Sequence, residues 1–153
     1  MKHMTKKIFM PILALLLAAA ILPLPRTFAA DTSESTYVED LGNGITVESV
    51  LVVEPSLTRS SSRSASLTST FKNNGVQIAV ITLNANFVYD GSTSRATYAS
   101  YSKDISSGWT YTDHSLTRSG GTAKLTATLK KFPLVVPVDM HISCSPSGVI
   151  TKG

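Results

Sequence analysis

The chain is nearly devoid of cysteine: Cys144 is the only one in 153 residues. A single thiol cannot close an internal disulfide, so the fold must depend on its hydrophobic core. Cys144 is in phase with Val138, Met140 and Ile142, and this alternation predicts a small buried hydrophobic residue rather than a reactive nucleophile. The sequence leaves open whether Cys144 pairs with a second chain.

Residue types that carry catalysis or bind metals are also scarce. From Asp90 onward there is no Glu, and only His114 and His141 lie outside the leading segment. Neighbouring strand residues face apart, so Asp113 is not expected to orient His114. No Gly-x-Ser-x-Gly elbow, phosphate-binding glycine loop or third metal ligand at a recognisable spacing is present. We therefore expect no metal site, no cofactor and no enzyme; a small secreted hydrolase that uses His114 or His141 is the alternative.

The first 30 residues have a basic start, an apolar middle and a small-residue end. Three lysines precede an uncharged stretch (residues 8–25), and Ala29 and Ala30 follow it. This order is typical of a secretory signal peptide, with cleavage after Ala29 or Ala30. Two prolines interrupt the apolar stretch, which disfavours a membrane anchor. We expect a secreted, extracellular protein that meets the membrane only through its signal helix, before cleavage.

Without residues 1–30 the chain has no net charge. Four of its 14 Lys and Arg lie in that segment, and the remaining ten equal the ten Asp and Glu. A neutral domain lacks the field that draws proteins to phosphate backbones, so we expect no nucleic-acid partner. The charge is uneven, because residues 31–54 hold six acidic residues and no basic one. We interpret this segment as acidic and solvated; a basic face elsewhere that binds an anionic wall polymer is the alternative.

Apolar residues recur at every second position through most of the remaining chain, which is typical of strands. The rhythm is clearest over 76–89 and 123–130, and turn formers such as Asn73-Asn74-Gly75 and Ser119-Gly120-Gly121 separate the segments. Strands are predicted over 45–54, 65–72, 76–89, 95–103, 109–118, 123–130 and 138–144. No segment after residue 30 shows a helical period.

About seven short strands without helices predict an all-β fold, an antiparallel β-sandwich of immunoglobulin-like outline. A barrel is the alternative. The paired cysteines and intervening Trp of immunoglobulin domains are absent, so the sheet topology is left open. The predicted organisation is a signal peptide (1–30), a loose polar lead-in (31–44) and a single sandwich domain (45–153).

Aromatic residues supply the candidate ligand-binding site: Tyr98, Tyr101, Trp109 and Tyr111. Exposed Trp and Tyr rings stack on sugars and mark partner surfaces. The interpretation we favour is that Trp109 fills the core and the tyrosines rim it, because large aromatic side chains dominate core energetics.

Two arginines in the serine-rich stretch 59–66 form a second candidate. Arg59 and Arg63 are a possible anion-binding pair. We favour instead the interpretation that they are charges on an edge strand, which discourage pairing with another chain.

The segment from Phe87 to Gly148 contains the runs Tyr-Asp-Gly, Gly-Trp-Thr-Tyr-Thr-Asp-His-Ser, Ser-Gly-Gly-Thr-Ala and Ser-Cys-Ser-Pro-Ser-Gly. In these runs the chain resembles small, uncharacterised secreted β-sandwich proteins of Gram-positive bacteria. The resemblance implies export and a β fold, and no particular activity.

The sequence therefore predicts a secreted, non-enzymatic β-sandwich that acts as a binding or structural module at the cell envelope. The expected partners are a cell-wall glycan, a wall polymer or another surface protein. A secreted inhibitor or toxin-like effector fits the same features. The sequence determines neither the ligand nor the oligomeric state.

Overall fold

The computed structural model describes residues 32–55 and 61–153, which form nine strands and no helix. The predicted signal helix, which falls within residues 1–30, lies outside the described residues. Within the described ranges no helix is long and apolar enough to cross a membrane. The strands are β1 (Ser33–Gly42), β2 (Ile45–Val53), β3 (Ser62–Asn73), β4 (Val76–Tyr89), β5 (Ser94–Ile105), β6 (Thr110–Ser119), β7 (Thr122–Lys131), β8 (Leu134–Cys144) and β9 (Ile150–Lys152).

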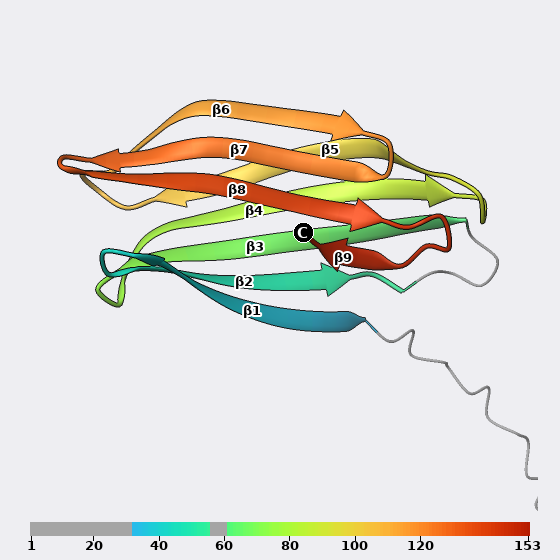
Figure 1. Cartoon of the computed structure of the whole chain (residues 1–153), viewed down its shortest axis with the longest axis horizontal. Helices are drawn as coiled ribbons and strands as arrows, with labels where there is room; N and C mark the ends of the chain where they lie inside the picture. Colours follow the sequence, from blue (N-terminus) through green and yellow to red (C-terminus); the bar gives the residue numbers. More distant parts are fainter. Residues whose placement is uncertain (1–31, 56–60) are drawn as a thin grey trace, which may run out of the picture.

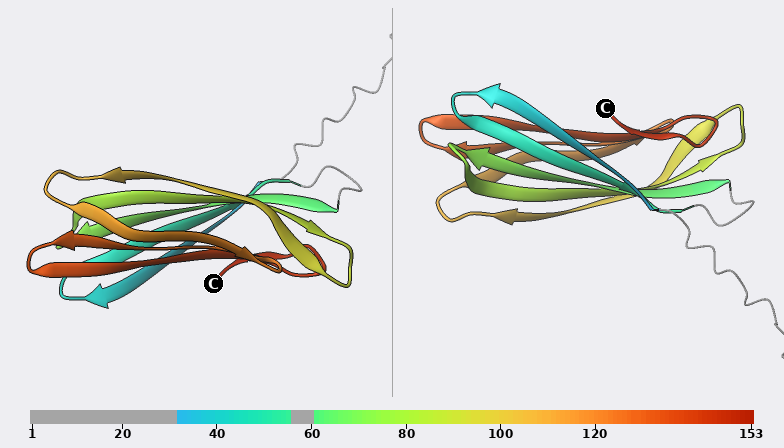
Figure 2. Two further views of the ribbon diagram at one scale, coloured as in Figure 1. Left: turned by 90° about the horizontal axis from the view of Figure 1, so that it is seen from above. Right: turned by 90° about the horizontal axis from the view of Figure 1, so that it is seen from below.

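Two antiparallel sheets pack face to face, as Figures 1 and 2 show. The first sheet has the order β1-β2-β3-β4-β5, and the second has the order β6-β7-β8-β9. The all-β antiparallel sandwich is therefore confirmed, with nine described strands rather than seven. Each strand pairs only with its neighbours in the chain, so each sheet is a meander. The sandwich lacks the Greek-key connections of immunoglobulin domains, because the chain passes from one sheet to the other once, between β5 and β6.

Tight Asn-Gly turns set the register of the first sheet. Asn43 and Gly44 have φ of 53° and 75°, and Asn74 and Gly75 have φ of 49° and 80°. Positive φ at both central positions is the geometry that two-residue hairpins need. The two turns lie together, since the Asn74 amide donates to the Gly44 carbonyl at 2.7 Å. The turn predicted at residues 73–75 is confirmed.

The core lies between the sheets and follows the predicted alternation. The inner face of β4 carries Ile81, Leu83 and Phe87, which have no exposed surface, and Leu125 and Leu129 of β7 are equally buried. Each such side chain contributes about 1.5–3 kcal/mol relative to an exposed one. Further core members are Val138, Met140, Ile142 and Cys144, so the prediction that Cys144 is buried is confirmed.

The prediction of a loose lead-in over 31–44 is wrong. This segment contains β1, which pairs with β2 from Ser33–Val53 to Gly42–Ile45. All ten residues of β1 are exposed, so no buried face imposes the alternation by which strands are recognised. The sandwich therefore begins at β1 rather than at residue 45.

The last sheet also extends beyond the prediction. β8 begins at Leu134 rather than at residue 138, and it includes Pro137, which pairs with Thr128. A proline is tolerated there because β9 pairs only with residues 142–144 of β8, which leaves β8 a free edge at Pro137. β9 lies beyond the last predicted strand, which ended at residue 144.

Candidate functional site at the open edge of β5 and β6

β5 and β6 are the edge strands of the two sheets, and they lie side by side along one margin of the sandwich (Figure 1). We call this margin the β5–β6 edge. They follow one another in the chain, joined by a tight loop in which the Trp109 amide donates to the Ser106 carbonyl at 3.1 Å. Because each edge strand lacks a neighbour on one side, inner-face side chains reach solvent here.

A bulge in β6 determines which side chains face this edge. The pairing of β6 with β7 shifts between Thr112 and Ser115, and Asp113 has a φ of 55°. An unbroken strand would place Asp113 on the same face as Tyr111. Instead its carboxylate turns away and accepts hydrogen bonds from Lys130 and Thr112, both at 2.9 Å. These two donors, Lys130 first, lower the pKa of Asp113.

The bulge turns His114 toward two tyrosines. Its ring stacks on Tyr111 with centroids 5.8 Å apart, and Tyr101 of β5 lies 5.8 Å from it. The two tyrosine centroids are 6.2 Å apart, and the Lys103 Nζ atom lies 5.0 Å from the Tyr111 centroid. The Tyr111 ring therefore has its contacts within the protein, in a cluster that closes the inner space at this margin.

The hydroxyl of Tyr111 is an unusual feature of this cluster. Its oxygen is buried and has no hydrogen-bond partner of good geometry among the described residues. Burial, and then the neighbouring Tyr101, raises the pKa of Tyr111 to about 12. The phenol stays neutral at physiological pH, so it does not neutralise Lys103.

The four aromatic candidates do not form one patch. Tyr101 and Tyr111 lie together, whereas Trp109 is 9% exposed and belongs to the core. Tyr98 pairs with Asn86 and Tyr101 pairs with Leu83, which places the two tyrosines on opposite faces of the first sheet. Tyr98 is 53% exposed on the outer face, away from the cluster.

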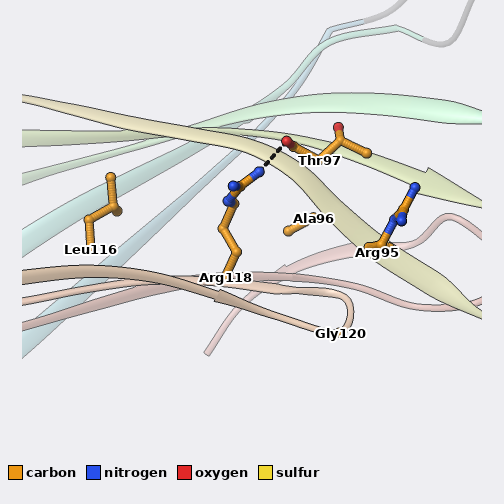
Figure 3. Close-up of a pocket in the computed structure, with 6 residues that line it drawn as sticks. All are labelled: Arg95, Ala96, Thr97, Leu116, Arg118 and Gly120. Carbon is orange, nitrogen blue, oxygen red and sulfur yellow. Dashed lines mark hydrogen bonds between the residues drawn. The ribbon is translucent and has the colours of Figure 1, made fainter.

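A groove of about 660 Å³ lies further along the same two strands (Figure 3). Arg118 reaches across from β6 and donates to the Thr97 carbonyl of β5, and Leu116 points the same way. Arg95 lines the opposite side, and the remaining lining residues are Ala96 and Gly120. Within the described residues neither arginine forms an ion pair with a carboxylate.

Three lysines elsewhere on the sheets differ from these two arginines because they form ion pairs. Lys72 pairs with Glu48 at 2.7 Å, and Lys124 and Lys130 pair with Asp139 and Asp113, both at 2.9 Å. At the β5–β6 edge, in contrast, Arg95, Lys103 and Arg118 have no carboxylate partner in the described part of the chain. Asp104 on β5 opposes them, and the three cations leave the margin with an excess of positive charge.

The arginine candidates of the serine-rich stretch have a different outcome. Arg59 lies outside the described residues. Arg63 lies near the start of β3, where it pairs with Phe87 of β4 and lies beyond the end of the pairing with β2 at Ala65. It faces the interior opposite Phe87, and its Nε atom is buried without a hydrogen-bond partner among the described residues. Burial raises the pKa of the nearby Cys144 thiol, and the Arg63 charge partly offsets this effect.

Neither histidine is placed in an arrangement typical of catalysis. Asp113 is bound to Lys130, which confirms the expectation that it does not orient His114. The Nδ1 atom of His141 lies 3.7 Å from Asp139, and that carboxylate is shared with Lys124. No group of three or more His, Cys, Asp or Glu able to hold a metal ion occurs in the described ranges.

Comparisons with protein-family models, with curated proteins and with solved structures gave no match for this chain. An inference about its function therefore depends on the geometry of its own residues. Sequence reasoning did not single out Arg95, Lys103 and Arg118, because they are separated in the chain and only the β5–β6 crossing brings them to one margin. The turn-forming residues that bound β5 and β6 were the sequence signal that could have placed these two strands beside each other.

Proposed function

We propose that the protein is a secreted, non-enzymatic binding module of the cell envelope that holds an extended anionic chain, such as an acidic wall polymer, along the β5–β6 edge. The observation that carries the proposal is the row of Arg95, Lys103, His114 and Arg118, none of which has a carboxylate ion-pair partner among the described residues. The predicted signal peptide supports a location where such polymers occur.

The extent of the row favours a polymer over a small anion. Arg95 and Lys103 both lie on β5, eight residues apart. At 3.3 Å per residue, a strand of this length spans about 26 Å. The Debye length at physiological ionic strength is about 8 Å, so the ends of the row act separately and each suits its own anionic group. A chain with repeated charges satisfies several of them at once.

The neutrality of the chain beyond residue 30 makes this binding local. Without a long-range field, attraction depends on the cations that touch the polymer. Charge-assisted hydrogen bonds from arginine and lysine to carboxylate or phosphate supply the contacts. Binding is therefore expected to weaken steeply as salt is added.

The test compares polymers that differ in charge. The purified protein is applied to immobilised polygalacturonate, poly(glycerol phosphate) and neutral amylose, at low and at high salt. We expect binding to one or both anionic polymers at low salt and none to amylose. The two anionic probes separate a carboxylate ligand from a phosphate ligand.

Matched variants locate the site. Lys103→Gln with Arg118→Gln is expected to weaken binding about tenfold or more. Lys72→Gln with Lys124→Gln removes the same charge from the outer sheet faces, where both lysines are ion-paired, and should leave binding unchanged. Equal losses in the two double variants, or equal binding to amylose, would contradict the proposal.

A further inference from the structure

The margin opposite the β5–β6 edge is formed by β1, which lies at the far side of the first sheet (Figure 1). It is the one described strand in which every residue is exposed, although it pairs with β2 along its whole length. Among the described residues, its other side has no strand beside it. About every second residue of this ten-residue strand therefore directs its N–H and C=O groups to that side.

The side chains of β1 are acidic and partly apolar. Glu34, Glu39 and Asp40 form no ion pair within the described residues, and β1 contains no basic residue. Val38 is 75% exposed. β1 contains no lysine and no proline, two of the residue types that usually prevent edge-to-edge pairing.

The charges of β1 and β5 are opposite on the inner side of the sheet. Glu39 pairs with buried Val47, and Lys103 pairs with buried Ile81, so both point to the inner side. Asp40 points to the outer side, as does Arg95, which pairs with Val88. If the two sheets were joined edge to edge between residues 98 and 104 of β5, Glu39 would lie on the same face as Lys103. Arg95 lies outside that stretch, and the charged residue on the outer face within it is Asp104.

Part of the β5 edge is already occupied within the molecule. The Ala96 amide donates to the Gly120 carbonyl at 2.8 Å, and Arg118 donates to the Thr97 carbonyl. Among the described strands, none is hydrogen-bonded in a sheet to the free edge of β5 from residue 98 to residue 104. Seven residues are enough for a stable length of strand pairing in a sheet.

We infer that β1 of one copy adds as a strand to the free edge of β5 in a second copy. The inference rests on the proposed function, because it assigns the acidic β1 strand as an anionic chain held at the same basic edge. The two surfaces are different, so the contact is heterologous and repeats head to tail. The copies are expected to form linear assemblies that dissociate as salt is added.

Disulfide trapping tests which edges meet. Val38→Cys is made in one copy, and Ser102→Cys or Ser100→Cys in another. All three positions lie on the outer face, since Val38 pairs with Glu48, Ser102 with Thr82 and Ser100 with Asn84. On mixing under mild oxidation, we expect a disulfide between the β1 copy and at least one of the β5 copies. Each copy alone should stay uncrosslinked.

The controls use residues that the structure keeps away from the contact. Ser66→Cys lies on the central strand β3 and should not cross-link with Val38→Cys. Cys144 is 5% exposed, so it does not compete for the new thiols. Because Val38 is exposed, its substitution should leave the circular dichroism spectrum unchanged. Soluble polygalacturonate should suppress the cross-link by occupying the basic edge.

Each outcome decides a different point. Homodimers of the Val38→Cys copy would show that β1 pairs with β1, which overturns the inference. No cross-link at either β5 position, with polymer binding intact, would overturn the inference and leave the proposed function standing. A cross-link without binding to either anionic polymer would support the assembly and remove the wall polymer from the proposed function.

Discussion

The two open margins of this sandwich differ in charge and in how firmly they are attached to the core. The β5–β6 edge is basic, and its side chains form a ring cluster with Tyr101 and Tyr111 over the buried interior. β1 is acidic, exposed along its whole length and, among the described strands, hydrogen-bonded in the sheet to β2 alone. The interior between them is packed with aliphatic and aromatic side chains, so the recognition that we propose is assigned to the edges.

Truncation of a side chain at each margin should give the largest difference in the free energy of unfolding. Leu83 is fully buried and pairs with Tyr101, so Leu83→Ala is expected to lower the free energy of unfolding by about 2–5 kcal/mol. Val38→Ala on exposed β1 should change it by no more than about 0.5 kcal/mol. Urea unfolding measures both. Similar losses would mean that β1 is packed as firmly as β5.

The buried hydroxyl of Tyr111 gives a prediction specific to the basic edge. Tyr111→Phe removes a buried group that has no good partner among the described residues, so stability at neutral pH should stay the same or rise by about 1 kcal/mol. The raised pKa adds a pH dependence. The folded state holds the phenol proton more tightly than the unfolded state does. The free energy of unfolding of the wild type is therefore unaffected by this group below pH 10, and it falls as pH rises from 10 toward about 12, where the folded phenol ionises.

Unfolding curves of wild type and Tyr111→Phe across that alkaline range check the sign. The wild type should lose stability relative to the variant as pH rises, because the unfolded phenol releases its proton first. All other ionisable groups are common to the two proteins, so the difference isolates Tyr111. A constant difference from pH 9 to about 12 would contradict the raised pKa.

The sequence predicted the strands that have one buried face, and it missed the elements that have none. β4 over 76–89 and β7 around 123–130 show alternation because their inner residues must avoid water. β1 has no buried residue, so its strand was concealed behind a polar composition. The basic edge was missed for another reason: its cations are separated in the chain. In addition, a bulge that sets Asp113 and His114 opposite Ala127 alone changes the phase of β6, and periodicity cannot reveal it.

The bulge itself can be tested at Asp113, whose φ of 55° suits Asn better than a β-branched residue. Asp113→Asn and Asp113→Val remove the same charge, so their difference reports on the backbone alone. Asp113→Val should lower the thermal midpoint below that of Asp113→Asn. It should also weaken binding to the anionic polymer by moving His114. Equal midpoints and equal binding would mean that the bulge does not position the edge.

The smallest expected effect on stability separates the two margins most clearly. Glu39→Gln on β1 and Lys103→Gln on β5 each remove one charge that has no ion-pair partner among the described residues. Each should change the free energy of unfolding by no more than about 0.5 kcal/mol. Only Lys103→Gln should weaken polymer binding, whereas both should reduce the Val38–Ser102 or Val38–Ser100 cross-link. Because a charge that contributes nothing to folding contributes only to contacts with other molecules, loss of the cross-link at unchanged stability would assign both charges to recognition.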